Sequence, residues 1–409
     1  MSLTTRVEEL LGDRVGRLTH WGGDAVPIAS PRDEAELVTL LRTATADGLR
    51  VLPIGNGTKL DHALVPERVD LAVSTRRLVG ITAYDPAEGV LTARAGTSLR
   101  SLRETVEAQA HHLSPEVARG DRATLGGAIG AASIGADRLG HGPLRDRVLG
   151  VRVALSDGRI VKSGGALVKD VAGYDLHRLV CGAHGTLGVV VEASLRLASP
   201  GELRVLVRRR VASLDEGLAL CAQLRADVAA PRALRLDGDA SKLWLTLDLA
   251  GRRVAVEAAV DAALAHLGEA HALKGDGARR VGDELTEARR ERGQWPHLCV
   301  DALPSRFEAV VAAVLERGAS LGARFELHPA LGLGWLRFER APGRETAHAI
   351  DRAVRELGAA PRWCGLAPAL RTELVVASGA PAGAAIMRRV RLALDPTETF
   401  AGPRLHPDL

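Results

Sequence analysis

Residues Pro53-Ile54-Gly55-Asn56-Gly57-Thr58-Lys59 form the stretch of sequence that decides the fold. The loop directly follows a predicted strand, Arg50–Pro53. Glycine tolerates positive φ and has no Cβ, so successive backbone N–H groups in such a loop can point into one concavity and bind an anion. Thr58 adds a hydroxyl donor. The sequence therefore predicts a phosphate-binding loop at this position.

Two more glycine-rich loops follow in the first half of the chain. They are Thr124-Leu125-Gly126-Gly127-Ala128-Ile129-Gly130 and Gly182-Ala183-His184-Gly185-Thr186-Leu187-Gly188. One loop of this kind is most often a plain turn. Three such loops, each beside a strand or a short helix, favour a pyrophosphate, because its two negative charges need many N–H donors at close range.

The standard nucleotide motifs do not account for these loops. No stretch fits the Walker A pattern G-x-x-x-x-G-K-[ST]. The Rossmann fingerprint G-x-G-x-x-G also fails, since Leu60 stands where its third glycine belongs. Nicotinamide binding by a Rossmann domain is therefore not expected.

Composition sets wider limits on the class of protein. A chain of 409 residues suits two or three domains, and a net charge of +4 with acidic residues mixed throughout gives no basic face for nucleic acid. The four cysteines contain no C-x-x-C pair, which excludes the usual spacing of zinc ribbons and iron–sulfur clusters. We also expect no signal peptide and no transmembrane segment, because no long apolar run occurs.

At this point the sequence resembles a known family, the FAD-binding domain shared by vanillyl-alcohol oxidase, p-cresol methylhydroxylase and the D-2-hydroxy acid dehydrogenases. The pattern P-x-G-x-G-T is matched by Pro53 to Thr58, A-T-x-G-G by Ala123 to Gly127, and G-S-x-G-T-L-G-V-I-T-E-A by Gly182 to Ala193 with Ala183 for Ser. Several motifs thus occur in the family's order.

Within that family the sequence is most similar to the FAD-binding subunits of glycolate oxidase. Lys162 to Gly165 and Val168 to Leu176 resemble K-x-G-G and V-K-N-V-A-G-Y-D-L, with Asp170 in place of Asn. Leu394-Asp395-Pro396 with Arg404-Leu405 is similar to the family's F-D-P…G-R-L ending. The resemblance covers residues 25 to 200 strongly and the remainder loosely.

The resemblance and the residue pattern together give an α+β architecture. We expect a two-part FAD-binding domain of the p-cresol methylhydroxylase type at 1–200 and an α+β cap domain at 201–380. A tail at 381–409 should pack back on the FAD domain. In the cap, a strand–helix–strand order occurs twice, which suggests two related units forming one antiparallel sheet with helices on one face.

The resemblance also implies which residues bind FAD. The first loop should hold the pyrophosphate, the second should lie along the pyrophosphate and the flavin ring, and the third near the ribityl or adenosine end. The expected cofactor-binding residues are Pro53, Ile54, Gly55, Asn56, Gly57, Thr58, Lys59, Pro115, Thr124, Gly126, Gly127, Gly130, Gly185, Gly188, Val189 and Val190. Many relatives attach FAD covalently through a His in the first loop, and this loop has none, so non-covalent FAD is implied.

Catalytic residues are less clear from the sequence. Catalytic relatives often carry an H-x-G-x-G-x-x-H type of segment whose histidines help to hold a metal near the hydroxy acid. In the corresponding stretch, Glu326 to Gly332, His328 stands alone, so we predict no metal site there. A lone His beside a strand is more often structural. Lys169 and Tyr174 are further candidates that could face the flavin, although Tyr174 could equally pack under the loop.

The function implied by the resemblance is that of the FAD-binding subunit of a glycolate, or more broadly 2-hydroxy acid, oxidase or dehydrogenase. Hydride would pass to the flavin, and the acceptor would not be NAD. The family implies a second flavin subunit and an iron–sulfur subunit as partners, and a cytoplasmic location that includes attachment to the inner membrane through those partners. Two alternatives stay open: a flavin-bearing accessory or scaffold subunit without its own turnover, and a flavin-free interaction module, against which the intact first loop argues.

Overall fold

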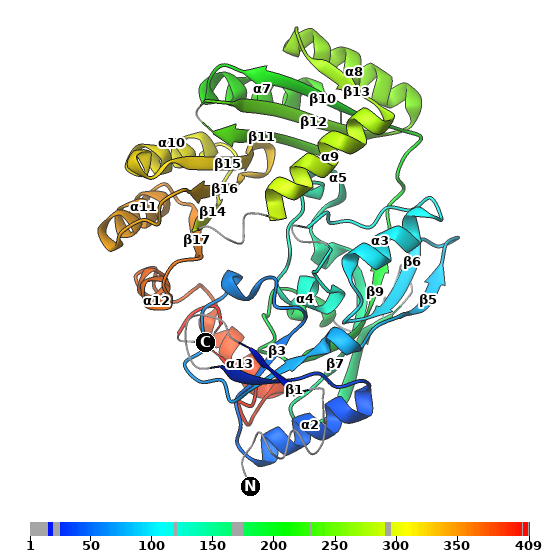
Figure 1. Cartoon of the computed structure of the whole chain (residues 1–409), viewed down its shortest axis with the longest axis vertical. Helices are drawn as coiled ribbons and strands as arrows, with labels where there is room; N and C mark the ends of the chain where they lie inside the picture. The colour runs from blue at the N-terminus through cyan, green and yellow to red at the C-terminus, as the bar shows by residue number, and fades with distance from the viewer. Residues whose placement is uncertain are drawn as a thin grey trace.

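A computed structural model describes residues 15–18, 25–117, 121–165, 175–229, 231–239, 241–290, 296–402, 404–407 and 409. It is elongated, with an eight-stranded sheet at one end and two smaller sheets at the other (Figure 1). No helix within these ranges is long and apolar enough to cross a membrane.

The first small sheet has four strands in the order β1-β2-β4-β3 and carries the first glycine loop at one strand end. Its strands are β1 (Val15–Leu18), β2 (Val26–Ala29), β3 (Val51–Ile54) and β4 (Leu71–Ser74). β2 and β3 both run parallel to β4. Helix α2 (Glu34–Ala46) begins at Asp33, whose side chain accepts a hydrogen bond from the Glu36 N–H, and it buries the predicted apolar stripe of Leu37, Leu40, Leu41 and Ala44.

The second small sheet is antiparallel throughout and has the order β5-β6-β9-β7-β8. Its strands are β5 (Ile81–Asp85), β6 (Val90–Arg94), β7 (Val148–Ala154), β8 (Ile160–Gly164) and β9 (Val189–Arg196). Short helices lie against it or join its strands: α3 (Leu99–Glu107), α4 (Leu125–Gly130), α5 (Arg138–His141) and α6 (His177–Val180). The sequence pattern showed no regular elements between His111 and Arg147, because α4 and α5 are too short to display helical periodicity.

The eight-stranded sheet is built from two β-α-β-β-α-β units, and this confirms the predicted antiparallel cap. The first unit is β10 (Leu203–Val211), α7 (Leu214–Asp227), β11 (Ala233–Asp239), β12 (Leu243–Gly251), α8 (Arg253–Leu267) and β13 (His271–Leu273). The second is β14 (His297–Asp301), α10 (Phe307–Arg317), β15 (Ala323–His328), β16 (Leu333–Phe338), α11 (Arg344–Glu356) and β17 (Ala360–Cys364). The strand order is β13-β10-β12-β11-β15-β16-β14-β17. Across the sheet, the strands of the first unit lie in the order fourth, first, third, second, and those of the second unit lie in the reverse order.

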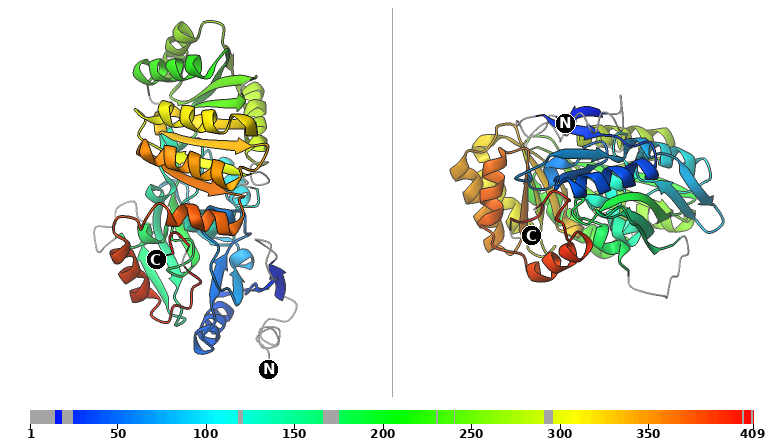
Figure 2. Two further views of the ribbon diagram at one scale, coloured as in Figure 1. Left: turned by 90° about the vertical axis from the view of Figure 1, so that its left-hand side faces the viewer. Right: turned by 90° about the horizontal axis from the view of Figure 1, so that it is seen from below.

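Four helices cover one face of this sheet, as the left view of Figure 2 shows. Apolar residues of α7, α8, α10 and α11 form a single core with alternate strand residues such as Leu245, Leu327 and Leu336. The expectation that all helices share that face was wrong in one respect. Helix α9 (Gly275–Arg290), which joins the two units, packs on the opposite face, where Val281 and Leu285 meet Leu206 of β10.

The last described segment returns to the first small sheet. After α12 (Pro368–Val376) and α13 (Ala384–Leu394), Phe400 pairs with Val51 in a parallel bridge beside β3. The Asp395 carboxylate accepts hydrogen bonds from the N–H groups of Thr399 and Phe400, at 3.0 and 2.7 Å, which fixes the turn before this bridge. The domain limits proposed from the sequence are consistent with this path and stay a prediction.

A buried charge network joins the large sheet to the second small sheet. Arg232, just before β11, binds Asp248 of β12 at 2.6 Å and Glu116 of the facing loop at 3.2 Å. Asp137 accepts from the Glu116 N–H at 2.8 Å and contacts His112 Nε2 at 3.1 Å. Burial alone would raise the pKa of Glu116, but the charges of Arg232, Arg204, His112 and Arg103 together outweigh it and hold that pKa below its ordinary value.

Replacing Arg232 should therefore loosen the two ends of the molecule from each other. In Arg232→Met, Glu116 would lose its ion-pair partner and Asp248 would keep only Arg204, so we expect a loss of roughly 1–3 kcal/mol of unfolding free energy. Urea denaturation followed by circular dichroism measures this. Arg253→Met is the matched control, because Arg253 forms an exposed ion pair with Glu257 and should cost less than about 1 kcal/mol. Equal costs for the two variants would contradict the role given to Arg232.

Candidate functional site

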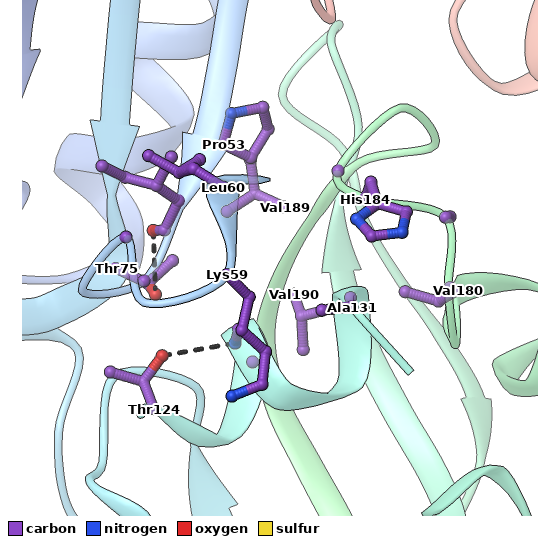
Figure 3. Close-up of a pocket in the computed structure, with 18 of the residues that line it drawn as sticks. Pro53, Lys59, Leu60, Thr75, Thr124, Ala131, Val180, His184, Val189 and Val190 are labelled. Atoms are coloured by element: carbon purple, nitrogen blue, oxygen red, sulfur yellow. Dashed lines mark hydrogen bonds between the residues drawn. The ribbon is translucent and has the colours of Figure 1, made fainter. Parts of the chain in front are cut away.

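The three glycine loops lie around one pocket. Every residue predicted to bind the cofactor lines it, except Pro115. The structure adds further lining residues that were not predicted: Leu60, Thr75, Ala131, Val180, Ala183, His184, Leu187 and Arg404. Figure 3 shows Lys59 and Thr124 on one side of this pocket and His184 on the other. Pro115 lies away from it, and its carbonyl oxygen accepts a hydrogen bond from Arg103 at 3.4 Å.

Glycine is required where the loops touch each other. A Cβ on Gly55 would lie 2.1 Å from Thr124 Oγ1, and a Cβ on Gly126 would lie 2.7 Å from that of Ala95. Gly185 approaches Pro53 in the same way, since its Cβ would be 3.0 Å from the proline ring. Glycine at positions 55 and 185 therefore lets the side chains of Thr124 and Pro53, from neighbouring loops, lie directly against the backbone.

Hydrogen bonds hold the first and second loops in place from behind. The Ser74 hydroxyl donates to the Gly55 carbonyl at 2.8 Å, and the Asn56 side-chain amide donates to the Arg122 carbonyl at 2.8 Å. The Thr124 hydroxyl caps α4 by accepting from the Gly127 N–H at 3.2 Å. Gly57 has a φ of +70°, a conformation that side chains rarely adopt, so the turn of the first loop depends on this residue.

The third loop carries His184, which the sequence analysis placed in a glycine loop without giving it a role. His184 has a positive φ of +50°, and its N–H donates to the Gly130 carbonyl at 2.8 Å. Burial, with the nearby charges of Arg404 and Arg362, lowers the pKa of His184 to about 3. Its imidazole is therefore neutral at pH 7 and presents one acceptor nitrogen.

Two arginines from late in the chain support the segment after the first loop. This segment is the short helix η2 (Leu60–His62) with Ala63 and Leu64. Arg404 donates to the carbonyls of Leu60, at 3.2 Å, and Leu64, and Arg371 donates to those of Asp61, at 2.8 Å, and Ala63. Because Arg404 also lines the pocket, the late segment both supports and completes the site.

Of the catalytic candidates, His328 lies in the described part of the chain and does not line this pocket. His328, at the end of β15, is buried, and its Nε2 lies 2.8 Å from Glu326 Oε1 while its ring meets Trp335 edge-on. Both of these partners belong to the large sheet. Lys169 and Tyr174 lie outside the described residues, so their roles stay predictions.

Comparison with known proteins identifies the kind of pocket. Residues 27–164 match the family of FAD binding domains, and the chain therefore carries an FAD-binding domain of that family. Gly130 lines the pocket, and a Cβ there would meet no protein atom within 4 Å, so this part of the lining leaves room for a ligand. FAD is thus the cofactor of this domain.

Particular relatives are similar over part of their length. The chain is 38% identical over 145 residues to the glycolate oxidase subunit GlcE of Escherichia coli, covering 35% of this chain and 41% of that one. It is 30% identical over 227 residues to the glycolate oxidase subunit GlcD of Bacillus subtilis, covering 54% and 47%. The D-lactate dehydrogenase of Archaeoglobus fulgidus is 32% identical over 171 residues, with 42% and 38% covered. The chain thus spans less than half the length of these curated relatives.

Solved structures confirm the fold over nearly the whole chain. An alkyldihydroxyacetonephosphate synthase superposes with a TM-score of 0.70, covering 92% of this chain and 76% of that one at 14% identity. At this identity the likeness concerns architecture alone. It confirms the α+β architecture of the chain.

Filling the pocket from Gly130 tests the site without disturbing the loop packing. In Gly130→Leu the new side chain meets no protein atom at its Cβ within 4 Å but projects into the pocket, so we expect loss of most bound FAD. The unfolding free energy of the FAD-free protein should change by less than about 1 kcal/mol. Flavin absorbance per chain and denaturation curves measure the two effects. Gly343→Leu, at another open glycine, should keep its FAD; full occupancy in Gly130→Leu would place the cofactor elsewhere.

Proposed function

We propose that the chain is the FAD-bearing subunit of a 2-hydroxy acid dehydrogenase or oxidase of the glycolate type. The observation that carries this proposal is a cationic cavity that adjoins the cofactor pocket. His62, Arg362 and Arg371 line this cavity, and it shares His184 and Arg404 with the pocket itself. A carboxylate substrate needs such positive charge within reach of the cofactor.

The face of the large sheet that carries Arg362 is polar, in contrast to the apolar face under the helices. The pairing registers place one residue from each of seven strands in a row across it. The row reads Arg210, Trp244, Asp237, Glu326, Trp335, Cys299 and Arg362. Neighbouring side chains in strands alternate between faces, so this row lies opposite the core residues Leu236, Leu327 and Leu298. The polar face is turned toward the FAD-binding part, as contacts of η2 with β17 and of α5 with β11 show.

Charges on this face are paired toward one end of the row. Arg208 and Arg235 both approach Asp237, at 3.5 and 3.6 Å, and the Arg208 guanidinium lies 4.5 Å from the ring centre of Trp244. At the other end, Arg362 donates to Cys299 Sγ at 3.7 Å, a weak acceptor. Binding a substrate carboxylate would therefore cost Arg362 only a weak hydrogen bond to sulfur, whereas Arg208 or Arg235 would have to give up an ion pair with Asp237. Arg337, which stands beside this row on β16, is a second arginine on the same face.

The chemistry then divides simply between cofactor and protein. FAD, when bound, supplies a two-electron acceptor for the carbon that bears the hydroxyl group. Arg362 would hold the substrate carboxylate, and the neutral imidazole of His184 would accept a hydrogen bond from the hydroxyl group. Packing of η2 against β17 would limit access of water to the same space.

A second candidate function rests on His328. Its nitrogen is directed to Glu326 and its ring to Trp335, which stands where the resemblance would require a second histidine. A site that held the hydroxy acid through those histidines is therefore absent from the described sheet. This favours a flavin-bearing accessory subunit whose substrate turnover needs other subunits. Under either reading, a second flavin subunit and an iron–sulfur subunit would be the partners, in the cytoplasm or at the inner membrane.

FAD should be released by denaturation. The first loop carries Asn56 and Thr58 and has no histidine, so no covalent attachment is expected there. Acid precipitation of the purified protein should leave yellow flavin in the supernatant, measured by absorbance and by fluorescence before and after phosphodiesterase. Flavin that stays with the pellet would contradict non-covalent binding.

Substrate reduction of the flavin separates the two candidate functions. Under anaerobic conditions we expect glycolate and D-lactate to bleach the flavin slowly in the isolated chain, because the described residues supply no strong base beside it, a group typically worth about 10²–10⁴-fold. Addition of partner subunits should raise the rate. Rapid bleaching by the chain alone would refute the accessory role, and no bleaching by any 2-hydroxy acid, alone or in the complex, would refute the dehydrogenase.

The role of Arg362 can be tested in the same assay. Arg362→Met should lower the bimolecular rate constant of bleaching by about 10- to 100-fold, the value of one charge-assisted hydrogen bond of about 1.5–3 kcal/mol. Arg344→Met, which removes an exposed arginine paired with Glu373 on α12, should leave the rate unchanged. Equal rates for both variants would remove Arg362 from the site.

A further inference from the structure

Three side chains with metal-binding donors converge where the large sheet meets the segment after the first loop. His297 of β14 and Cys364 of β17 are direct partners in the strand register and so lie on the same, polar, face of the sheet. His62 is the last residue of η2 and reaches the same point from the FAD-binding part. One donor atom of each residue lies within 4.8 Å of the donors of the other two.

This donor set suits a particular class of metal ion. Two imidazole nitrogens and one thiolate sulfur are typical ligands of Zn²⁺, at about 2.0–2.1 Å and 2.3 Å from the metal. Donors of a tetrahedral site are then separated by about 3.3–3.7 Å, so these three, which lie within 4.8 Å of one another, would need to approach by at most about 1.5 Å. His297 and Cys364 are buried, and the rings of His62 and His297 already meet edge-on with centroids 6.3 Å apart.

A second group of donors in the described residues does not fit a metal. His112, Asp137 and His141 also converge, but the Arg232 guanidinium lies 3.5 Å from His112 Nε2. Asp137 already accepts from the Glu116 N–H and contacts the same His112 nitrogen. A dication there would sit against the fixed positive charge of Arg232, so this group is explained by the charge network between the two ends of the molecule.

The charges and the burial around His62, His297 and Cys364 determine the protonation states of these ligands and the charge of a further ligand. Burial, with the charges of Lys59 and Arg362 nearby, lowers the pKa of His62, so its imidazole is neutral and can act as a ligand at pH 7. Burial raises the pKa of the Cys364 thiol to about 12, so the thiol must lose its proton to the solvent as a metal binds. Lys59 and Arg362 oppose a bare dication and favour a negatively charged fourth ligand.

We propose that His62, His297 and Cys364 form a zinc site whose fourth position is open to an anionic ligand from the adjoining cationic cavity. Three protein ligands and one open position are the arrangement of reactive rather than purely structural zinc sites. None of the three residues belongs to the segment Glu326 to Gly332, and the site does not depend on the activity proposed above. The bound ion would join the edge of the large sheet to the segment that follows the first loop.

Direct binding of Zn²⁺ and Co²⁺ to the FAD-containing protein tests this site after treatment with a chelator. One Zn²⁺ per chain is expected, with release of about one proton at pH 7 from the thiol. Co²⁺ should give the visible bands of tetrahedral coordination and a thiolate-to-cobalt charge-transfer band in the near ultraviolet, read as a difference against the metal-free flavoprotein. Zn²⁺ should abolish both. Absence of these bands in the folded wild type would overturn the proposal.

Variants assign the ligands. Cys364→Ser should remove the charge-transfer band, and His297→Ala should lower Zn²⁺ affinity by more than about 100-fold, beyond the 10–100-fold cost of losing an outer-sphere partner. Cys221→Ser, at a buried free thiol of α7, is the matched control and should keep both properties. Circular dichroism and flavin content verify that each variant is folded. Retention of the charge-transfer band in folded Cys364→Ser would also overturn the proposal.

Discussion

The contact of Gly55 with Thr124 is the constraint on which the site depends. A single Cβ at position 55 would lie 2.1 Å from the Thr124 hydroxyl, so the first and second loops can meet here only because residue 55 has no side chain. The same hydroxyl caps α4, and the carbonyl of Gly55 is held by Ser74. Moving this contact would therefore shift the first loop, the start of α4 and the edge of β4 together. The pocket keeps its shape because three elements share one crowded point.

The residues that could be predicted from the sequence were those whose role follows from a short stretch of sequence, without knowledge of residues far along the chain. The glycines of the three loops belong to this kind. By contrast, Arg404 lines the pocket only because Phe400 pairs with Val51, a contact that no short sequence window contains. Helix α4 escaped notice since six residues, half of them glycine, show no helical period.

In the large sheet, too, features set by short stretches of sequence could be predicted, whereas features set by long-range pairing could not. Its helices were predicted from their spacing, whereas β11 was missed because it ends in Asp237, Gly238 and Asp239, which read as a turn. That strand pairs with β15 at the centre of the sheet, where Asp237 faces Glu326 and Asp239 faces Arg324. Polar residues occur in the middle of this sheet because its second face is turned to another part of the protein rather than to an apolar core. His62 could be grouped with His297 and Cys364 only once the registers were known.

The return of the late segment to β3 has a consequence for how the protein is made. The carbonyl of Leu60 accepts a hydrogen bond from Arg404, which lies 344 positions further along the chain. At about 5–20 residues per second, the ribosome needs on the order of 20–70 s to synthesise the residues between them. During this interval the first loop has left the ribosome without the guanidinium that will bind its neighbouring carbonyls. The large sheet, whose strands all precede the tail, has time to form first. Completion of the cofactor pocket is therefore set to follow the synthesis of Arg404 rather than the emergence of the first loop.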